Sequence, residues 1–303
     1  MPNGEPVKKR PMGLKARTAQ KRRAESAGEP QTANPETATV ILKNPAGGED
    51  ATEVDEVEAI YGNAEDALAS GDTEQAIPLL RGTVHECDRI LRNHYQSAGD
   101  SLPPLPSKFY YVYGMALFSL GELSVPDDAA EYFGLGRERL EQALEEYNAR
   151  ESGGGGREFK FKILSGIAKA TLSQARFISR DRTFGSEITK AATSATELFN
   201  EALACIAAEN DAKYFEEVLV VPDLMFAFVE ANIEVKELQA AVDWGIGKLK
   251  DVVGKGQRLG EVYYQLARGT WVLASHYLEQ QDEETGDVPE QATVQKLLAQ
   301  GTP

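Results

Sequence analysis

Histidine and cysteine are the side chains of this sequence best suited to nucleophilic, acid–base or metal chemistry, and the chain has few of them. The histidines are His85, His94 and His276, and the cysteines are Cys87 and Cys205. His85, Cys87 and His94 are close in sequence, but a zinc site needs four converging ligands and the remainder is missing. We therefore expect structural histidines, small buried cysteines in a reducing compartment, and no metal site.

The sequence contains no motif that is typical of an enzyme. The four glycines at residues 153–156 lack the flanking strand and helix that a phosphate-binding loop requires, so we expect a loop or linker there. This segment is either native low complexity or an engineered join. Paired carboxylates such as Glu145 and Glu146 fit the solvent-facing surface of a helix. The prediction is a protein without catalytic residues and without a cofactor.

A basic stripe is the more specific candidate for a partner-binding site. Lys162, Lys169 and Arg176 recur every seven residues, so they share one face of a predicted helix. This stripe could dock an acidic partner segment, or it could pair with Glu and Asp of the adjacent helices. Charge runs on helices are usually solvated, which favours a structural role. The three residues remain the candidate partner-binding set.

Two basic clusters lie near the N-terminus, and ten residues separate them. Their members are Lys8, Lys9, Arg10, Lys21, Arg22 and Arg23. The pattern resembles a bipartite nuclear-localisation signal, in which each cluster fills its own acidic groove on a nuclear import receptor. The alternative is a basic tail that contacts RNA or acidic surfaces without specificity.

The charge of the chain is divided unevenly. The net charge is -16, but residues 1–24 carry eight Lys and Arg against one Glu, which leaves 24 Lys and Arg and 47 Asp and Glu elsewhere. The body therefore has a net charge of -23. Such a body repels nucleic-acid phosphates and attracts basic proteins, for example basic ribosomal or translation proteins.

Helical periodicity dominates the chain beyond residue 50. Residues 55–91 have the pattern of two helices folded back on each other at a Gly71-Asp72 turn, with small residues spaced as in tetratricopeptide hairpins. Further helices are expected at 110–123, 127–147, 159–178, 188–207, 214–221, 224–235, 238–253 and 259–278. Pro222 is expected to break a helix or to occupy its first turn. With no strand-like alternation, the predicted fold class is all-α: an irregular tetratricopeptide- or HEAT-like array of helical hairpins, or α-solenoid.

Three tyrosines, Tyr110, Tyr111 and Tyr113, lie together at the start of one of these helices. They could stack on a ligand, or they could pack between helices. Aromatic stripes on paired helices usually pack, so packing is the favoured interpretation.

Composition divides the chain into three segments. Residues 1–50 form a disordered basic tail with the localisation signal, 51–280 form the helical-repeat domain, and 281–303 form an acidic linker and a short C-terminal helix. No segment approaches the roughly 18 consecutive apolar residues of a membrane span, so no membrane partner is expected. The predicted localisation is nuclear, with shuttling to the cytoplasm as a further option.

The N-terminal motif Lys9-Arg10-Pro11-Met12-Gly13-Leu14, with the basic cluster that follows it, resembles the start of the fungal enhancer-of-translation-termination family. The fission-yeast branch of that family is known as a nuclear negative regulator of a prolyl-hydroxylase-like 2-oxoglutarate oxygenase. Residues 110–123 and the helix up to residue 147 also look like that family, so the resemblance covers most of the chain. This chain looks shorter than is usual there.

The resemblance implies a nuclear, all-helical scaffold without catalysis. Such a scaffold would bind the prolyl-hydroxylase-like oxygenase and a nuclear import receptor, and would promote translation termination or oxygen-dependent gene regulation. An alternative is an RNA- or ribosome-associated factor that contacts nucleic acid through its basic N-terminal tail. An unrecognised enzyme would require converging polar groups in a pocket.

Overall fold

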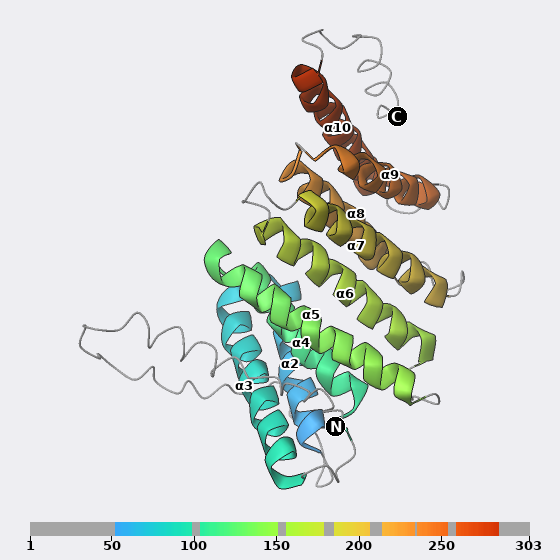
Figure 1. Ribbon diagram of the computed structural model, residues 1–303. Coiled ribbons are helices and arrows are strands. Elements are labelled where there is room, and N and C mark those ends of the chain that lie inside the picture. Colours follow the sequence, from blue (N-terminus) through green and yellow to red (C-terminus); the bar gives the residue numbers. More distant parts are fainter. Residues whose placement is uncertain are drawn as a thin grey trace, which may run out of the picture.

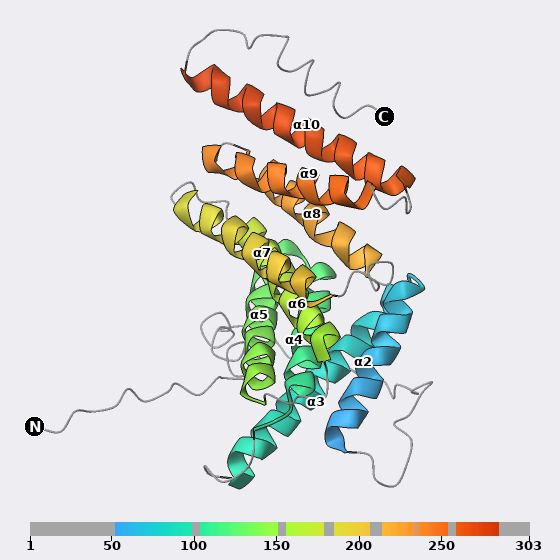
Figure 2. The same ribbon diagram turned by 90° about the vertical axis from the view of Figure 1, so that its right-hand side faces the viewer.

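The computed structural model describes residues 52–98, 104–150, 156–178, 185–206, 214–233, 235–253 and 259–284. These residues form α-helices and one short 3-10 helix, with no strand among them. The helices stack into an elongated array that runs from α2 and α3 to α10 (Figures 1 and 2). The predicted all-α helical array is confirmed. In the described part of the chain, no helix is both long enough and apolar enough to cross a membrane.

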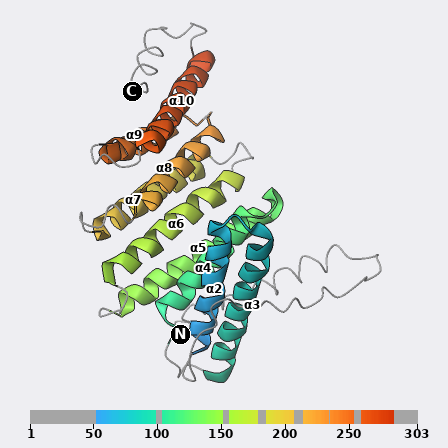
Figure 3. The same ribbon diagram turned by 180° about the vertical axis from the view of Figure 1, so that it is seen from behind.

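The first hairpin consists of α2 (Glu53–Ala69) and α3 (Thr73–Ala98). Thr52 and Asp55 form a capping box at the start of α2, and these hydrogen bonds hold the pKa of Asp55 below its usual value. Gly71 has a φ of 77°, a conformation that favours glycine, and it turns the chain back. Figure 3 shows α2 and α3 side by side and steeply inclined to the helices that follow.

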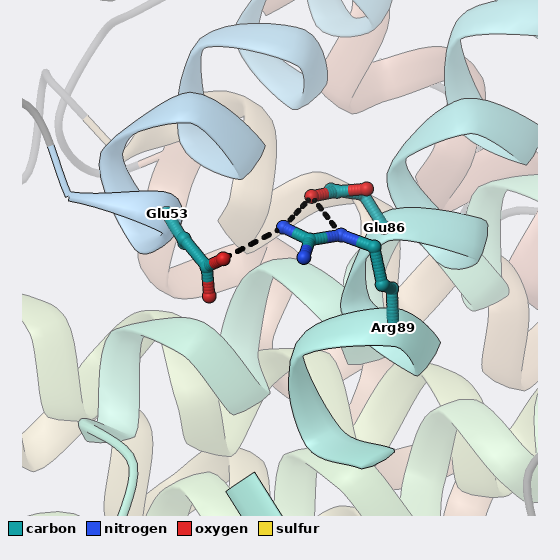
Figure 4. A network of polar contacts seen from close by, with 3 residues as sticks. All are labelled: Glu53, Glu86 and Arg89. Carbon is teal, nitrogen blue, oxygen red and sulfur yellow. Dashed lines mark hydrogen bonds and ion pairs between the residues drawn. The ribbon is translucent and has the colours of Figure 1, made fainter. Parts of the chain in front are cut away.

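An ion-pair network ties the two helices of this hairpin together (Figure 4). The Arg89 Nη2 atom on α3 lies 2.9 Å from Glu53 Oε1 on α2 and 2.5 Å from Glu86 Oε1. Its Nε–H also donates to Glu86 Oε1 at 2.8 Å. All three side chains are partly exposed, so the network contributes little to the free energy of unfolding. Its main effect is to orient α2 and α3 relative to each other.

The second hairpin, α4 (Ser107–Glu122) and α5 (Pro126–Ala149), has a close helix crossing in which backbone meets backbone. A Cβ atom built on Gly114 would lie 2.9 Å from the carbonyl oxygen of Gly136, and one built on Gly136 would lie 3.0 Å from the carbonyl oxygen of Gly114. The two backbones can approach this closely because neither position carries a side chain. Tyr110 and Tyr113 are buried beside this crossing, which confirms the packing interpretation of the aromatic cluster.

Helix α6 (Gly156–Ile178) lies in the middle of the array and pairs with α7 (Gly185–Cys205). The Lys160 Nζ atom on α6 lies 2.8 Å from Glu201 Oε1 on α7. Buried side chains form two clusters, one spanning α2–α6 and the other spanning α6–α10. Phe161 and Leu164 belong to the second cluster and Ile163 to the first, so α6 is buried on two sides.

The last part of the array consists of α8 (Phe215–Glu230), the 3-10 helix η3 (Lys236–Leu238), α9 (Gln239–Val253) and α10 (Leu259–Glu284). Pro222 lies inside α8, so the expected break between residues 221 and 224 is wrong. Buried packing on both sides of Pro222 outweighs the lost backbone hydrogen bond: the Phe226 ring, one turn further on, fits between Gly245 of α9 and Gly269 of α10. Helix α10 continues to Glu284, four residues beyond the expected domain end at 280.

Several expectations lie outside the described residues. They are the basic tail of residues 1–50, the glycines at 153–155 and the short C-terminal helix after residue 284. Of the four-glycine segment, only Gly156 is described, as the first residue of α6.

Candidate functional site

A hollow of the described surface lies between α5, α6 and α7. Its volume is about 370 Å³, which is within the range of small-ligand and peptide side-chain pockets. Its apolar wall includes Ile167, Ile188 and Leu198. Its polar lining comprises Arg137, Glu141, Thr171, Gln174, Glu187, Lys190 and Ser194. We call this hollow the α5–α7 cavity.

The charges of the α5–α7 cavity are mixed in sign. Arg137 Nε lies 3.4 Å from Glu141 Oε1, one turn away on α5. Partial burial raises the pKa of Glu141, and the nearby Arg137 opposes that shift. Lys190 and Ser194 of α7 also line a second, more open hollow, so this edge of α7 is accessible from both sides. An apolar wall with donors and acceptors at its rim suits a protein segment that carries both kinds of group.

The predicted basic stripe is divided by the fold. Lys162 and Arg176 are exposed, but Lys169 is only 9% exposed. Partial desolvation raises the pKa of the Glu122 carboxyl on α4, and the nearby Lys169 ammonium opposes that shift. For Lys169, this favours pairing with an adjacent helix over docking of a partner.

The basic stripe and the α5–α7 cavity lie on opposite sides of α6. At about 100° per residue, Ile167, Thr171 and Gln174 are roughly 140–160° around the helix from Lys169. The cavity could not be predicted from the sequence, because its walls come from three consecutive helices whose packing angles the helical spacing does not define. The polar residues Thr171 and Gln174 within an apolar helix were the available signal, and alone they do not identify a cavity.

A buried polar network joins α3, α4 and α5. The Tyr113 hydroxyl donates a hydrogen bond of 2.5 Å to Asp88 Oδ1, and the Arg139 guanidinium carbon lies 5.0 Å from the centre of the Tyr113 ring. The exposed fractions of Asp88, Tyr113 and Arg139 are 7%, 1% and 2%. A substrate in solution cannot reach these groups, so their arrangement suits the joining of helices rather than catalysis.

The histidines and cysteines have separate surroundings. His276 is buried, with Nε2 2.8 Å from the carbonyl oxygen of Val235, which confirms a structural role. His85 is exposed. Cys87 is buried, and burial raises the pKa of its thiol, whereas Cys205 is only partly buried. Within the described ranges, no three His, Cys, Asp or Glu side chains are grouped to hold a metal ion.

The sequence of this helical array matches a known protein family. A family model described as nuclear pore complex subunit Nro1 matches residues 7–218, from the basic tail into α8. This chain belongs to the Nro1 family. The Nro1-family match covers most of the chain, and its description confirms the predicted nuclear localisation at the level of the family.

Curated relatives support the same assignment. Enhancer of translation termination 1 from Meyerozyma guilliermondii is 31% identical over 144 residues, which are 46% of this chain and 31% of that protein. The protein of the same name from Candida albicans is 36% identical over 69 residues, 22% of this chain and 16% of that protein. The negative regulator of ofd1 from Schizosaccharomyces pombe is 35% identical over 75 residues, 24% and 18% of the two chains. These matches span less than a third of the length of the relatives, and they confirm the resemblance seen in the sequence.

A solved structure was also found. It is the nuclear import adaptor Nro1 of S. pombe, with 15% identity, a TM-score of 0.38, and coverage of 85% of this chain and 98% of that one.

Proposed function

We propose that this chain is a nuclear adaptor without catalytic activity that binds a prolyl-hydroxylase-like oxygenase. Through this binding it promotes translation termination or oxygen-dependent gene regulation. The match of residues 7–218 to the Nro1 family is the observation that carries the proposal. A relative named as a negative regulator of ofd1 and others named as enhancers of translation termination support it.

The proposed oxygenase-binding surface is the α5–α7 cavity together with the exposed edge of α7. The cavity combines apolar walls with polar groups at its rim, whereas the basic stripe is interrupted at Lys169. The exposed residues Lys162 and Arg176 remain the alternative surface on the other side of α6.

Binding assays with the oxygenase of the same fungus can separate these two surfaces. Ser194→Trp should fill the cavity from an exposed position and weaken binding at least tenfold. Ala204→Trp, an exposed site elsewhere on α7, is the matched control. A Lys162→Glu/Arg176→Glu variant tests the stripe and leaves the buried Lys169 intact. If only the stripe variant loses binding, the cavity assignment is wrong; if wild-type protein does not bind the oxygenase, the proposed function is wrong.

The basic tail is proposed as a bipartite signal for a nuclear import receptor. Alanine at Lys8, Lys9, Arg10, Lys21, Arg22 and Arg23 should move a fluorescent fusion out of the nucleus. Alanine at the spacer residues Lys15 and Arg17 should not. A sextuple variant that remains fully nuclear would contradict the assignment.

The tail also supports a second function, as an RNA- or ribosome-contacting segment. Eight cations in 24 residues favour phosphate binding that weakens steeply with salt. RNA binding that disappears when residues 1–24 are deleted, and that weakens by orders of magnitude between 50 and 200 mM salt, is expected for this role. Salt-insensitive binding would count against it.

A further inference from the structure

The outer face of α10 exposes aromatic and apolar side chains in a regular row. Tyr264, Trp271 and Leu278 recur every seven residues and are 71%, 63% and 41% exposed. Ala267 and Ser275 lie four residues on either side of Trp271. We call these five residues the α10 outer face, and none of them carries a charge. Of the seven large hydrophobic side chains that are exposed in the described residues, four lie on α10.

The α10 outer face has no helix packed over it among the described residues. Helix α10 packs against α9 and α8 through its opposite side, where Val262 and Leu273 are buried and Gly269 receives the Phe226 ring. It is the last described helix of the stack (Figures 1 and 2). A row of exposed aromatic and apolar side chains on one helix face indicates a binding surface.

We propose that the α10 outer face binds the same face of a second copy of this chain, with the two α10 helices antiparallel. A two-fold axis at Trp271 would place Tyr264 of each copy opposite Leu278 of the other, because both lie seven residues from Trp271. The small residues Ala267 and Ser275 would leave room on each side for the indole of the partner's Trp271. This fit of one indole beside the small residues next to the other favours a second copy over an unrelated partner.

Charge and area define how strong such a dimer can be. The chain has a net charge of -16, so two copies repel each other, but the α10 outer face adds no charge to the contact. Arg268, the one cation of the described helix, is directed to Asp223 and Glu230 of α8. The exposed aromatic and apolar surface amounts to about 450 Å² per copy, or about 900 Å² for a pair. That area is below the roughly 1,200–2,000 Å² of stable specific interfaces and in the range of weak, transient ones, so we expect a micromolar dimer that salt strengthens.

Sedimentation velocity of the full chain from about 1 to 200 μM tests the dimer. The mass should rise with concentration from 33.0 kDa towards twice that value. Trp271→Glu should keep the chain monomeric over the whole range. Val125→Glu is the matched control, because Val125 is 64% exposed on another part of the array. Both variants should keep the wild-type melting temperature, since the replaced side chains lie on the surface.

Cross-linking tests the antiparallel register in a Cys205→Ser background. Tyr264→Cys and Leu278→Cys chains should be joined by a short bismaleimide when they are mixed, and neither should be joined efficiently to itself. Efficient cross-linking between two Tyr264→Cys chains would contradict the antiparallel register.

Three results would overturn the proposal. One is a wild-type chain that stays monomeric at 200 μM, and another is a Trp271→Glu variant that dimerises like the wild type. The third is a full chain that stays monomeric while the chain lacking residues 285–303 dimerises. That result would mean that this segment covers the α10 outer face.

Discussion

Tyr113 is the residue at which the first part of the array depends most on one polar contact. Its hydroxyl is the hydrogen-bond donor to Asp88, a carboxylate that is 7% exposed. Arg139 lies over the ring of the same tyrosine. Three helices therefore meet at a buried group of polar side chains, in which Tyr113 contacts both Asp88 and Arg139.

Tyr113→Phe should lower the free energy of unfolding by about 1.5–3 kcal/mol, because it leaves a buried carboxylate without its donor. Urea unfolding followed by circular dichroism measures this loss. Tyr132→Phe is the control, since Tyr132 on α5 is only partly buried, and its effect should stay within about 0.5 kcal/mol. Equal losses in the two variants would contradict the role of the Asp88 contact.

Alkaline pH should destabilise the wild-type chain through the same tyrosine. Burial, followed by the nearby Asp88, raises the pKa of Tyr113 above the usual value of about 10. Because the pKa is higher in the folded than in the unfolded state, the stabilisation from protonated Tyr113 is complete below pH 10. It is lost as the pH rises further. We expect a loss of up to about 1.4 kcal/mol per pH unit from this group above pH 10, and a smaller slope in Tyr113→Phe. Identical slopes would exclude Tyr113 as the group responsible.

The burial of Tyr110 and Tyr113 could be predicted from the sequence, whereas the partner of Tyr113 could not. Helical spacing predicts which residues face inwards. It does not predict that Asp88, from another helix, shares the same interior. The same limit applies to Lys169, which belongs to an apparent surface stripe but is buried beside Glu122.

At the scale of helices, the crossing of α4 and α5 depends on two glycines. Gly114 and Gly136 allow backbone atoms of the two helices to touch. A glycine at this point of a tetratricopeptide-like helix is typical of close contact with the paired helix. The continuity of α8 through Pro222 was beyond prediction, because it depends on packing against α9 and α10 rather than on local preference.

Gly114→Ala should destabilise the chain by about 1–3 kcal/mol, since its Cβ would lie 2.6 Å from Leu140 Cγ and 2.9 Å from the Gly136 carbonyl. Gly62→Ala on α2 provides the opposite case, because nothing lies within 4 Å of a Cβ there. That variant should stabilise the chain by about 0.5–1 kcal/mol through helix propensity. Thermal melts of both variants measure the contrast, and a neutral Gly114→Ala would mean that the helices can separate without cost.

At the scale of the whole molecule, α6 is the helix that both cores share. Ile163 is buried with the α2–α5 side chains, and Leu164, the next residue, is buried with those of α7–α10. The sequence predicts an array of hairpins, but it does not predict that one helix divides the interior into two clusters. That property follows from how the helices on each side meet α6.

Ile163→Ala and Leu164→Ala should each lower the free energy of unfolding by about 2–5 kcal/mol. The two variants should destabilise different halves of the array. Native-state hydrogen exchange should show lost protection mainly in α2–α5 for Ile163→Ala and mainly in α7–α10 for Leu164→Ala. Lys162→Ala, at an exposed position on the same helix, serves as the control. A uniform loss in both core variants would show one cooperative unit instead of two.

The double burial of α6 also gives the array a direction during synthesis. Once residue 178 has left the ribosome, every helix of the first core is outside it, and that core can close before α7 emerges. The second side of α6, with Phe161 and Leu164, then remains open to solvent until the later helices arrive. The nascent chain should therefore acquire its structure in two steps, and the exposed side of α6 marks the interval in which it is most open to chaperones.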